Sequence, residues 1–483
     1  MHTGATHDAG TFFWHDYETT GADPCRDRPV QFAGQRTSLD LVPIDAPVMF
    51  HCKPAPDVLP HPAACLITGI TPQHAEREGL IEAEFAARVH AELAEPGTCG
   101  VGYNSLRFDD AFTRNLFYRN FHDPYEREWK DGNSRWDLID VARMCYALRP
   151  DGIEWPRRAD GAPSFRLQDL AGANHLEQRR AHDALSDVEA TLALARLIRA
   201  RQPRLWDWNL AGRRKQKALQ LLDVAHMTPL VHVSSRYPAD RGCLALVAPI
   251  TGHPDQANTV IVFDLSTDPG DLASLDSEEI ADRVFTARAD LPEEIERIPL
   301  KLIRANHSPS LAPMSVLRGV DCARIALDVE RCLANLERLR RIDGLAEKVR
   351  QVFSRLDAAE STLDPELALY AGFADDTDKR LMREVRGTLP AQLGQRDFPF
   401  HDARYPELLF RYRARNWPET LDAVEQTRWD AFRRRRLDIE TPLTTLTLDQ
   451  YFATITALRN DPLTAPDKLA LLDALEVWGR NLA

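Results

Sequence analysis

The chain has 483 residues, a formal net charge of −13 and a sequence pI of about 5.6. Its length predicts two to four domains, and a hydrophobic content of 44% is enough for sizeable cores. The acidic balance argues against a general coat of basic residues for nucleic-acid binding, but it leaves room for a local basic groove. No apolar run approaches the roughly 20 residues of a membrane helix, and residues 1–10 lack the apolar core of a signal peptide.

The eight cysteines are spread along the chain, and no two of them form a C-x-x-C pair. This spacing argues against a zinc ribbon or a redox motif. Scattered cysteines in apolar surroundings are typical of reduced thiols in a cytosolic protein. We therefore expect a cytoplasmic location and no membrane partner.

The first predicted strand carries two acids. The segment Thr11–Gly21 begins with aromatic and β-favouring residues and ends in small polar residues and a glycine, as a buried strand does before a turn. Asp16 and Glu18 are two residues apart, so on a strand their side chains lie on the same face. Two neighbouring carboxylates repel each other unless a cation lies between them, and Mg²⁺ prefers oxygen ligands. The alternative is that Asp16 only starts a turn and that Glu18 is solvated.

The next elements predict a mixed sheet that is covered by helices. Residues 30–33 and 48–52 read as strands that continue an antiparallel meander. Thr71 and Pro72 are a helix-start signal, with Thr as the N-cap and Pro at the first helical position, and the helical pattern runs to Leu93. Residues 99–103 form a further short strand. Strands followed by helix, strand and helix indicate an α/β fold.

A third acid, Asp109, lies at the start of the next predicted helix. It shares a helical face with Phe112 and Leu116, which should pack on the sheet, whereas Asp110 points elsewhere and can be solvated. A carboxylate on a packed face needs a partner, because an unpaired buried charge is costly. The alternative is an acid that is favoured by the helix dipole.

The fourth acid follows a histidine. Asp183 is a plausible N-cap, and Asp187 lies on the apolar face of the helix that begins there. His182 would stand just ahead of this helix and could lean over the site that Asp187 enters. A histidine at a helix start can also be purely structural.

Together, Asp16, Glu18, Asp109, Asp187 and His182 are the residue types that a two-metal phosphodiesterase needs. Two divalent ions roughly 4 Å apart stabilise the attacking and leaving oxygens, and acids bridge the ions and balance their charge. Histidine suits the deprotonation of the attacking water, because its protonation changes near neutral pH.

The order of these motifs resembles the DEDDh group of 3′–5′ exonucleases, which have a ribonuclease-H-like fold. The motifs are Asp-x-Glu, Asn-x-x-x-Phe-Asp and His-x-x-x-x-Asp. Their flanks are similar to the bacterial exodeoxyribonuclease I family along essentially the whole chain from about residue 11. The matching segments are His15-Asp16-Tyr17-Glu18-Thr19, Leu66-Ile67-Thr68-Gly69-Ile70-Thr71, Gly102-Tyr103-Asn104, Asn133-Ser134-Arg135-Trp136-Asp137, Pro163-Ser164-Phe165-Arg166-Leu167 and Tyr412-Arg413-Ala414-Arg415-Asn416.

The resemblance implies a role for each residue of the set. Asp16, Glu18 and Asp187 would bind one Mg²⁺, and Asp16 and Asp109 would hold a second, with Mn²⁺ able to substitute. His182 would be the general base. All five positions are intact, which argues against an inactive enzyme.

The resemblance also implies contacts with the substrate. Glu18 and Arg166 would contact it near the scissile phosphate, and a guanidinium suits bidentate phosphate binding. Further positions that would line the path of the strand, by base stacking or phosphate contact, are Arg114, Tyr125, Trp129 and Arg143. Plain core packing is the expected role of Phe117 and Phe121 in the same aromatic stretch.

The rest of the chain divides into two further predicted domains. We expect a DEDDh exonuclease domain at 11–201, an SH3-like domain with helical additions at 202–356 and a helical C-terminal domain at 357–483. Short strands near residues 230, 244, 260 and 302 favour a small β-rich domain, and the SH3-like barrel is implied by the family. Residues 357–365 are a plausible break.

Two basic runs, residues 213–217 and 433–436, read as solvated helix faces, or as the lining of a channel for single-stranded DNA. In the family, the later domains close over the nuclease domain to form such a channel. Encirclement would explain processive digestion, because a strand held by many contacts leaves slowly.

The family also binds the acidic, aromatic-ended tail of single-strand-binding protein. The residues that would match this pocket are Arg149, Trp208, Arg318 and Arg340. Thr228 stands where a lysine is expected, which weakens this assignment.

The leading hypothesis is a monomeric, processive, Mg²⁺-dependent 3′–5′ exonuclease that hydrolyses single-stranded DNA to 5′-mononucleotides in DNA repair and recombination. A 3′–5′ exoribonuclease would use the same acids, although such enzymes typically lack the extra domains. A single-strand DNA-binding scaffold with an inactive nuclease site is the alternative outside enzymes.

Overall fold

The computed structural model describes residues 10–177, 182–354 and 363–482. These residues form two compact units, each made of separate stretches of the chain. Of the described residues, unit 1 contains 10–134, 182–192 and 363–482, and unit 2 contains 135–177 and 193–354. No helix among the described residues is long and apolar enough to cross a membrane.

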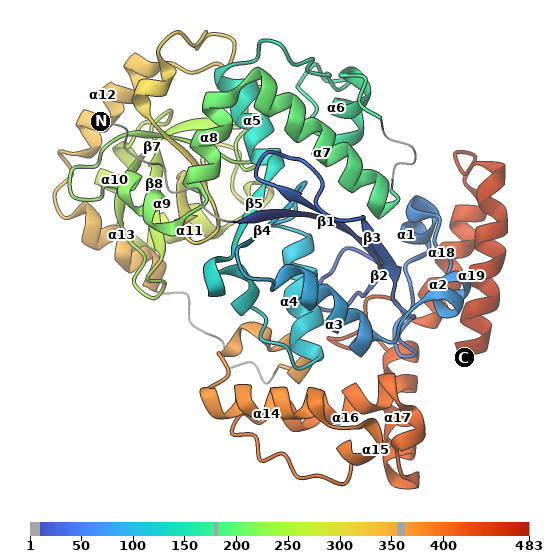
Figure 1. Ribbon diagram of the computed structural model, residues 1–483. Helices are drawn as coiled ribbons and strands as arrows, with labels where there is room; N and C mark the ends of the chain where they lie inside the picture. Colours follow the sequence, from blue (N-terminus) through green and yellow to red (C-terminus); the bar gives the residue numbers. More distant parts are fainter. Residues whose placement is uncertain (1–9, 178–181, 355–362, 483) are drawn as a thin grey trace, which may run out of the picture. The chain divides into compact units, whose positions relative to one another are not determined.

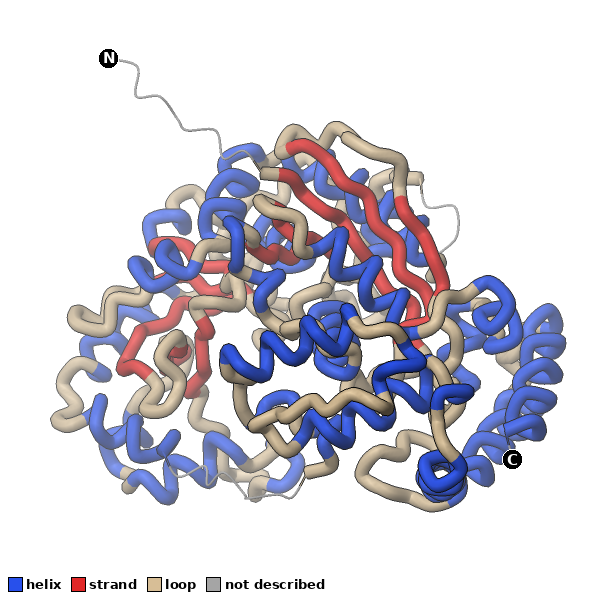
Figure 2. Tube along the Cα trace, turned by 60° about the horizontal axis from the view of Figure 1, so that its bottom comes forward, coloured by secondary structure: helices blue, strands red, loops and turns tan. Residues whose placement is uncertain are grey.

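The sheet of unit 1 is built around its first strand (Figure 1). β1 pairs antiparallel with β2 and in parallel with β4, and β2 pairs antiparallel with β3, so the predicted meander is confirmed. Figure 2 shows strands of this sheet running side by side. The chain passes into unit 2 within β5, the fifth strand in the order β3-β2-β1-β4-β5. The strands are β1 (Thr11–Thr19), β2 (Pro29–Ser38), β3 (Val48–His51), β4 (Thr98–Gly102) and β5 (Ser134–Asp137).

Helices cover this sheet on the side to which Phe13 and Tyr17 of β1 point, where they pack with residues of α3 and α4. The helical pattern after Thr71 is confirmed in two pieces, because α2 ends at Glu78. The next residue, Gly79, lies against the backbone of Lys53 with no room for a side chain. Thr71 caps α2 as predicted, since its side chain accepts a hydrogen bond from the backbone N–H of His74. The helices are α1 (Pro62–Thr68), α2 (Pro72–Glu78), α3 (Glu82–Leu93), α4 (Asp109–Arg119) and α7 (Ala184–Arg201), whose second half belongs to unit 2.

The C-terminal residues 363–482 are helical, as predicted, and belong to unit 1. Tyr405 and Tyr412 of α16 pack with Tyr118 and Phe121, so the expected core role of Phe121 is confirmed. Helices α17 to α19 form a second core with α1. These helices are α14 (Asp376–Gly387), α15 (Pro390–Leu393), α16 (Arg404–Asn416), α17 (Ala423–Asp438), α18 (Leu448–Asn460) and α19 (Leu469–Leu482).

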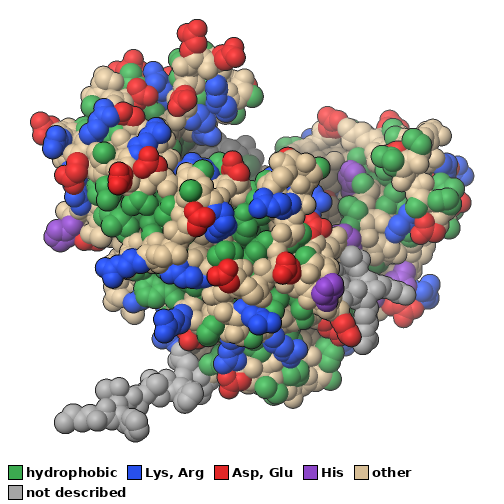
Figure 3. Space-filling view, turned by 90° about the horizontal axis from the view of Figure 1, so that it is seen from above, with side chains coloured by type: hydrophobic (Ala, Val, Ile, Leu, Met, Phe, Trp, Pro, Cys, Tyr) green, Lys and Arg blue, Asp and Glu red, His purple; other side chains and the backbone are tan. Residues whose placement is uncertain are grey.

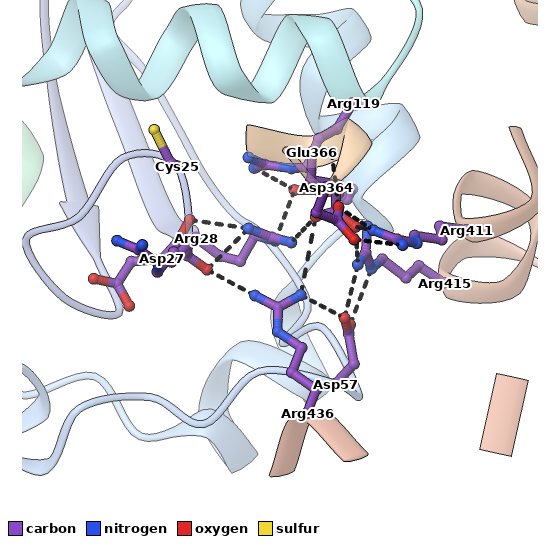
Figure 4. Close-up of polar contacts among 12 residues, drawn as sticks. Cys25, Asp27, Arg28, Asp57, Arg119, Asp364, Glu366, Arg411, Arg415 and Arg436 are labelled. Carbon is purple, nitrogen blue, oxygen red and sulfur yellow. Dashed lines mark hydrogen bonds and ion pairs between the residues drawn. The ribbon is translucent and has the colours of Figure 1, made fainter. Parts of the chain in front are cut away.

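A buried ionic network joins this helical region to the part of unit 1 that precedes α3 (Figure 4). Asp57 and Glu366 are 0% and 1% exposed. Asp57 receives hydrogen bonds from Arg415 and Arg436, at 2.7 Å in each case, and Glu366 receives one from Arg28 at 2.9 Å. Burial alone would raise the pKa of both carboxyls, but the surrounding guanidinium groups hold both pKa values well below their usual range. We call this set, completed by Arg411, the buried ionic network.

Two sequence predictions about charged residues are wrong. Arg436 is not on a solvated helix face, because it is 4% exposed and lies in the buried ionic network. Asp110 is not solvated, because it is 2% exposed and forms an ion pair with the buried Arg127. On the face drawn in Figure 3, basic and acidic side chains are interspersed rather than gathered into one basic coat.

Unit 2 contains a second sheet with the strand order β10-β6-β7-β8-β9, in which all pairs are antiparallel. The four predicted strands are confirmed, and β10 was not predicted. The strand order does not close on itself. The strands are β6 (Leu230–Val233), β7 (Leu244–Gly252), β8 (Thr259–Asp264), β9 (Leu300–Arg304) and β10 (Ser310–Pro313).

The helices of unit 2 come from both of its chain segments. They are α5 (Leu138–Leu148), α6 (Leu167–Ala173), α8 (Pro203–Gly212), α9 (Lys215–Leu221), α10 (Gly270–Ser274), α11 (Ser277–Phe285), α12 (Val329–Leu339) and α13 (Leu345–Ser354). The predicted break at residues 357–365 falls largely outside the described residues.

Candidate active site

The first two acids lie at the end of β1, on the face opposite the core formed with α3 and α4. Because side chains alternate along a strand, Asp16 and Glu18 share one face while Phe13 and Tyr17 fill the core on the other. The pairing of β1 with β2 becomes irregular between Glu18 and Thr19, at the end of the strand. Glu18 is 7% exposed, so its carboxylate is almost completely removed from water.

The third acid is hydrogen-bonded to β1 at Tyr17, the residue between the first two acids. Asp109 is the first residue of α4 and is 2% exposed. Its Oδ1 accepts a hydrogen bond of 3.1 Å from the backbone N–H of Tyr17. The hydroxyl groups of Thr113 and Tyr17 lie 3.0 Å apart, and Thr113 also donates to the carbonyl of Asp109. The predicted placement of Asp109 on a packed face is therefore confirmed.

The fourth acid enters from the start of α7. The Asp183 side chain accepts a hydrogen bond of 3.2 Å from the backbone N–H of Ser186, which confirms Asp183 as the helix cap. The side chain of Gln31 on β2 accepts a hydrogen bond of 3.1 Å from the N–H of Ala184 and so ties this helix start to the sheet. Asp187 is half-buried.

Glu18, His182 and Asp187 can each offer a ligand atom, and these three atoms lie within 4.8 Å of one another. His182 is exposed and has a φ of 61°, a left-handed conformation that is uncommon for residues other than glycine. Asn104, whose φ is 65°, lines the same site. Strained backbone of this kind is found preferentially where structure serves function.

All five predicted residues line one cavity of about 490 Å³. Sequence reasoning missed several other residues of its wall. Asp27 and His61 come from the loops that follow β1 and precede α1, and Thr445 comes from the C-terminal region. No local pattern marks these positions, because only the fold brings them to the acids.

The carboxylates disfavour one another's ionised forms. Burial is the largest cause that raises the pKa of Glu18 to about 8, and the charges of Asp187 and Asp109 add to it. Burial and the charges of Asp109 and Glu18 likewise raise the pKa of Asp16 well above its usual range. Divalent cations would reverse both effects, since they favour the ionised carboxylates. The oxygen-rich cluster therefore fits hard divalent ions such as Mg²⁺.

Three family models match the chain. They are described as Exonuclease (residues 13–195), Exonuclease I SH3-like domain (residues 213–355) and Exonuclease I C-terminal domain (residues 363–482). Exodeoxyribonuclease I of Escherichia coli is 46% identical over 472 residues, which are 98% of each chain. This chain belongs to the exodeoxyribonuclease I family. It is therefore an exonuclease, as its motifs predicted.

The solved structures agree with this membership. Exonuclease I from Methylocaldum szegediense matches with a TM-score of 0.94 and 48% identity, covering 98% of this chain and 100% of its own. Exonuclease I of E. coli in complex with a dA16 oligonucleotide matches with the same TM-score and 46% identity, over the same shares of the two chains. The predicted fold class, including the SH3-like assignment, is thereby confirmed.

The predicted substrate residues of unit 1 differ in how accessible they are. Trp129 is 64% exposed, and Tyr125 is half-buried with its ring 5.3 Å from that of Phe373. Arg114 is 8% exposed and donates two hydrogen bonds to Glu128, at 2.7 and 3.1 Å. A phosphate would have to compete with this carboxylate for Arg114. Its role as a substrate contact stays a prediction.

Unit 2 holds the other predicted substrate residues. Arg166 is exposed at the start of α6. Arg143 is 8% exposed and donates to Asp140 at 2.7 Å, with its guanidinium 5.8 Å from the ring centre of Phe165. Both assignments stay predictions.

The four predicted partner residues also lie in unit 2. Arg149 donates to the carbonyl of Arg318 at 3.1 Å. Arg340 donates to the carbonyl of His226 at 2.9 Å, two residues before Thr228. The Trp208 indole donates to the carbonyl of Leu311 at 2.7 Å. All three contacts therefore bring together residues that are far apart in the sequence.

Replacement of Asp187 by Asn should stabilise the metal-free protein at pH 8. Glu18 has a pKa raised to about 8 in the folded state, so it costs no stability below its ordinary pKa. As the pH rises from there, stability is lost, and the loss is nearly complete at pH 8. Removal of the neighbouring charge lessens this cost. Thermal unfolding in EDTA should give Asp187→Asn a higher midpoint than the wild type at pH 8 and a smaller difference at pH 5.

Addition of Mg²⁺ at pH 8 should then raise the wild-type midpoint and leave that of Asp187→Asn almost unchanged. Glu189→Gln is the matched control, because Glu189 is an exposed acid on the same helix. A metal-free midpoint of Asp187→Asn below that of the wild type at pH 8 would show that the carboxylates do not strain the fold.

Proposed function

We propose that the protein is a two-metal-ion 3′–5′ exonuclease that digests single-stranded DNA processively to 5′-mononucleotides and acts as a monomer in DNA repair and recombination. The observation that carries the proposal is the convergence of Asp16, Glu18, Asp109, Asp187 and His182 on one cavity. Solved relatives support the substrate, since E. coli exonuclease I is known in complex with oligonucleotides. A zinc-bound form of the E. coli ExoI–ssDNA complex supports a divalent ion, and the choice of Mg²⁺ is our proposal.

In this proposal, residues of the chain hold the metal ions and remove a proton from the attacking water. Asp16, Glu18 and Asp187 would hold one ion, and Asp16 and Asp109 the other. When bound, such ions supply charge stabilisation for the attacking and leaving oxygens. The N–H of Tyr17 fixes the Asp109 carboxylate, so this ligand does not have to be ordered when the substrate arrives. His182 accepts the proton of the attacking water at its ring nitrogen.

The proposed function also predicts the direction of digestion. A 5′-labelled oligonucleotide, prepared as DNA and as RNA, should shorten from its 3′ end in Mg²⁺ when it is DNA and only faintly when it is RNA. EDTA should abolish the shortening, because the acids cannot stabilise the developing charge alone. Gel separation of the labelled ladder measures all four conditions.

Each other outcome of this assay selects a different function. Equal or faster shortening of the RNA would replace the proposal with a 3′–5′ exoribonuclease. Retention of the DNA without shortening in Mg²⁺ or Mn²⁺ would favour a DNA-binding scaffold.

His182→Ala should slow hydrolysis by roughly 10²- to 10⁴-fold, the usual effect of removing a general base. Asp187→Ala should abolish turnover while much of the binding of a single strand remains. Glu189→Ala, on the solvent side of α7, should behave like the wild type. Single-turnover rates and Mn²⁺ affinity should be measured together. A loss of metal affinity in His182→Ala equal to its loss of rate would make His182 a ligand instead.

We also propose that unit 2 binds the acidic, aromatic-ended tail of single-strand-binding protein. An "ExoI/SSB-Ct complex" is among the solved relatives. Within this chain, Arg149 contacts Arg318, and Arg340 contacts the segment that precedes Thr228.

Arg340→Ala should weaken the binding of a fluorescent acidic tail peptide at least several-fold, because a charge opposite the acidic tail is lost. Arg338→Ala is the matched control, since Arg338 lies two residues before Arg340, in the last turn of α12, but pairs with Asp268. Thr228→Lys should tighten binding by restoring the expected positive charge. Fluorescence-anisotropy titrations measure the affinity for the peptide. Equal affinities of Arg340→Ala and Arg338→Ala would contradict the assignment.

A further inference from the structure

The loop of residues 20–28 continues directly from the strand that carries Asp16 and Glu18. Hydrogen bonds within the loop close it: Thr20 N–H donates to the Arg28 carbonyl at 2.8 Å, and Arg28 N–H donates to the Thr20 hydroxyl at 2.8 Å. β1 loses its regular register at Glu18 and Thr19, where this loop begins. Such irregularities re-aim the neighbouring side chains, so the placement of the loop influences where Glu18 points.

Asp27 is the buried acid of this loop. It is 4% exposed, lines the catalytic cavity and has no role in the reaction derived above. Its Oδ2 accepts a hydrogen bond of 2.8 Å from the N–H of Asp23. Gly21 approaches it so closely that a Cβ at Gly21 would lie 2.3 Å from Asp27 Oδ2. The loop is therefore packed around this carboxylate.

The C-terminal region contacts the loop at three points. Arg436 of α17 donates to the Arg26 carbonyl at 3.2 Å, and Arg26 in turn donates to the Pro442 carbonyl at 2.5 Å. The Thr445 hydroxyl donates to Asp27 Oδ1 at 3.3 Å. Thr445 is itself part of the cavity wall. The region thus contacts the loop and forms part of the cavity.

Arg436 links these contacts to the buried ionic network (Figure 4). One of its terminal nitrogens donates to Asp57 at 2.7 Å, and the other donates to the Arg26 carbonyl. The loop is held from the same side by Arg28, which donates to the Arg26 carbonyl at 3.0 Å and to Glu366 at 2.9 Å. Because Arg436 and Arg28, which hold the loop, are buried and paired with carboxylates, the loop has little freedom to shift.

We propose that the C-terminal helical region completes the catalytic pocket, with Arg436 and Thr445 as positioning residues that hold the loop 20–28 and the end of β1 in the geometry needed for hydrolysis. This inference rests on the proposed nuclease function. It gives the C-terminal helices a part in the chemical step itself, through the position of Glu18 and Asp27. Small displacements of reacting groups can lower rates by about 10²-fold, so a loosened loop should be visible in the turnover.

The chain offers a matched pair of variants for the test. The side chains of Arg436 and Arg415 are each 4% exposed, and both donate to Asp57. Only Arg436 also donates to the loop, whereas Arg415 donates to Glu366. Lysine keeps the charge but cannot reproduce the two-ended guanidinium contact. Arg436→Lys and Arg415→Lys should therefore disturb the same network, and only the first should free the loop.

Two measurements on the full-length chain separate positioning from stability. With a labelled single-stranded DNA oligonucleotide and Mg²⁺, Arg436→Lys should lower kcat roughly 10-fold or more with little change in KM, whereas Arg415→Lys should change kcat less than about 2-fold. Thermal unfolding midpoints of the two variants should be similar. Amide hydrogen exchange should be faster in residues 23–28 of Arg436→Lys and unchanged there in Arg415→Lys.

A third variant removes only the cavity-wall contact. Thr445→Val should lower kcat, and Thr445→Ser should restore it, because serine keeps the hydroxyl that donates to Asp27. Equal kcat values in Arg436→Lys and Arg415→Lys, or unchanged exchange of the loop in Arg436→Lys, would overturn the inference. If the wild type does not shorten DNA at all, the proposed function fails, and the exchange measurement alone still decides whether Arg436 holds the loop.

Discussion

The mutual repulsion of four carboxylates is the interaction on which the site depends. Asp16 and Glu18 share a strand face, and Asp109 is held between them by the N–H of Tyr17. Burial and the neighbouring charges raise the pKa of Glu18 to about 8, so the fold maintains a cluster that is unfavourable without cations. This arrangement would favour the binding of divalent ions, because an ion converts each repulsion into an attraction. Membership of the exodeoxyribonuclease I family is consistent with this electrostatic design.

The buried ionic network of unit 1 has the opposite arrangement of charge, because its carboxylates are paired with guanidinium groups. Asp57 and Glu366 are completely buried, but guanidinium groups surround them and lower their pKa values. Removal of one partner from such a network is strongly destabilising, since it leaves a buried charge unpaired. The network joins segments more than 300 residues apart in the sequence, such as Arg28 and Glu366. Residues 20–28 lie between the two clusters and are held by the second while they form a wall of the first.

The parts of the site that sequence reasoning predicted are those encoded by local patterns. Strand alternation placed Asp16 and Glu18 on one face, and capping preferences located Asp183 and thus the helix of Asp187. Local sequence patterns did not predict the pairing of residues that are far apart in the chain. The burial of Asp110 depends on Arg127, and the burial of Arg436 depends on Asp57. Thr445 and Asp27 meet through the tertiary fold alone. The predicted domain limits stay predictions. The predicted DNA and partner contacts also stay predictions, because they concern surfaces that the chain forms only with another molecule.

The most direct test of the account asks whether a metal ion contacts the scissile phosphate. The 3′-terminal linkage of a DNA oligonucleotide can be made with sulfur in place of either non-bridging oxygen, and the two isomers can be separated. Mg²⁺ binds sulfur poorly and Mn²⁺ accepts it more readily. The account predicts that at least one isomer is cleaved much more slowly than normal DNA in Mg²⁺ and recovers about 10-fold or more in Mn²⁺. Equal slowing of both isomers in the two metals would contradict a metal-bound phosphate and, with it, the role assigned to the four carboxylates.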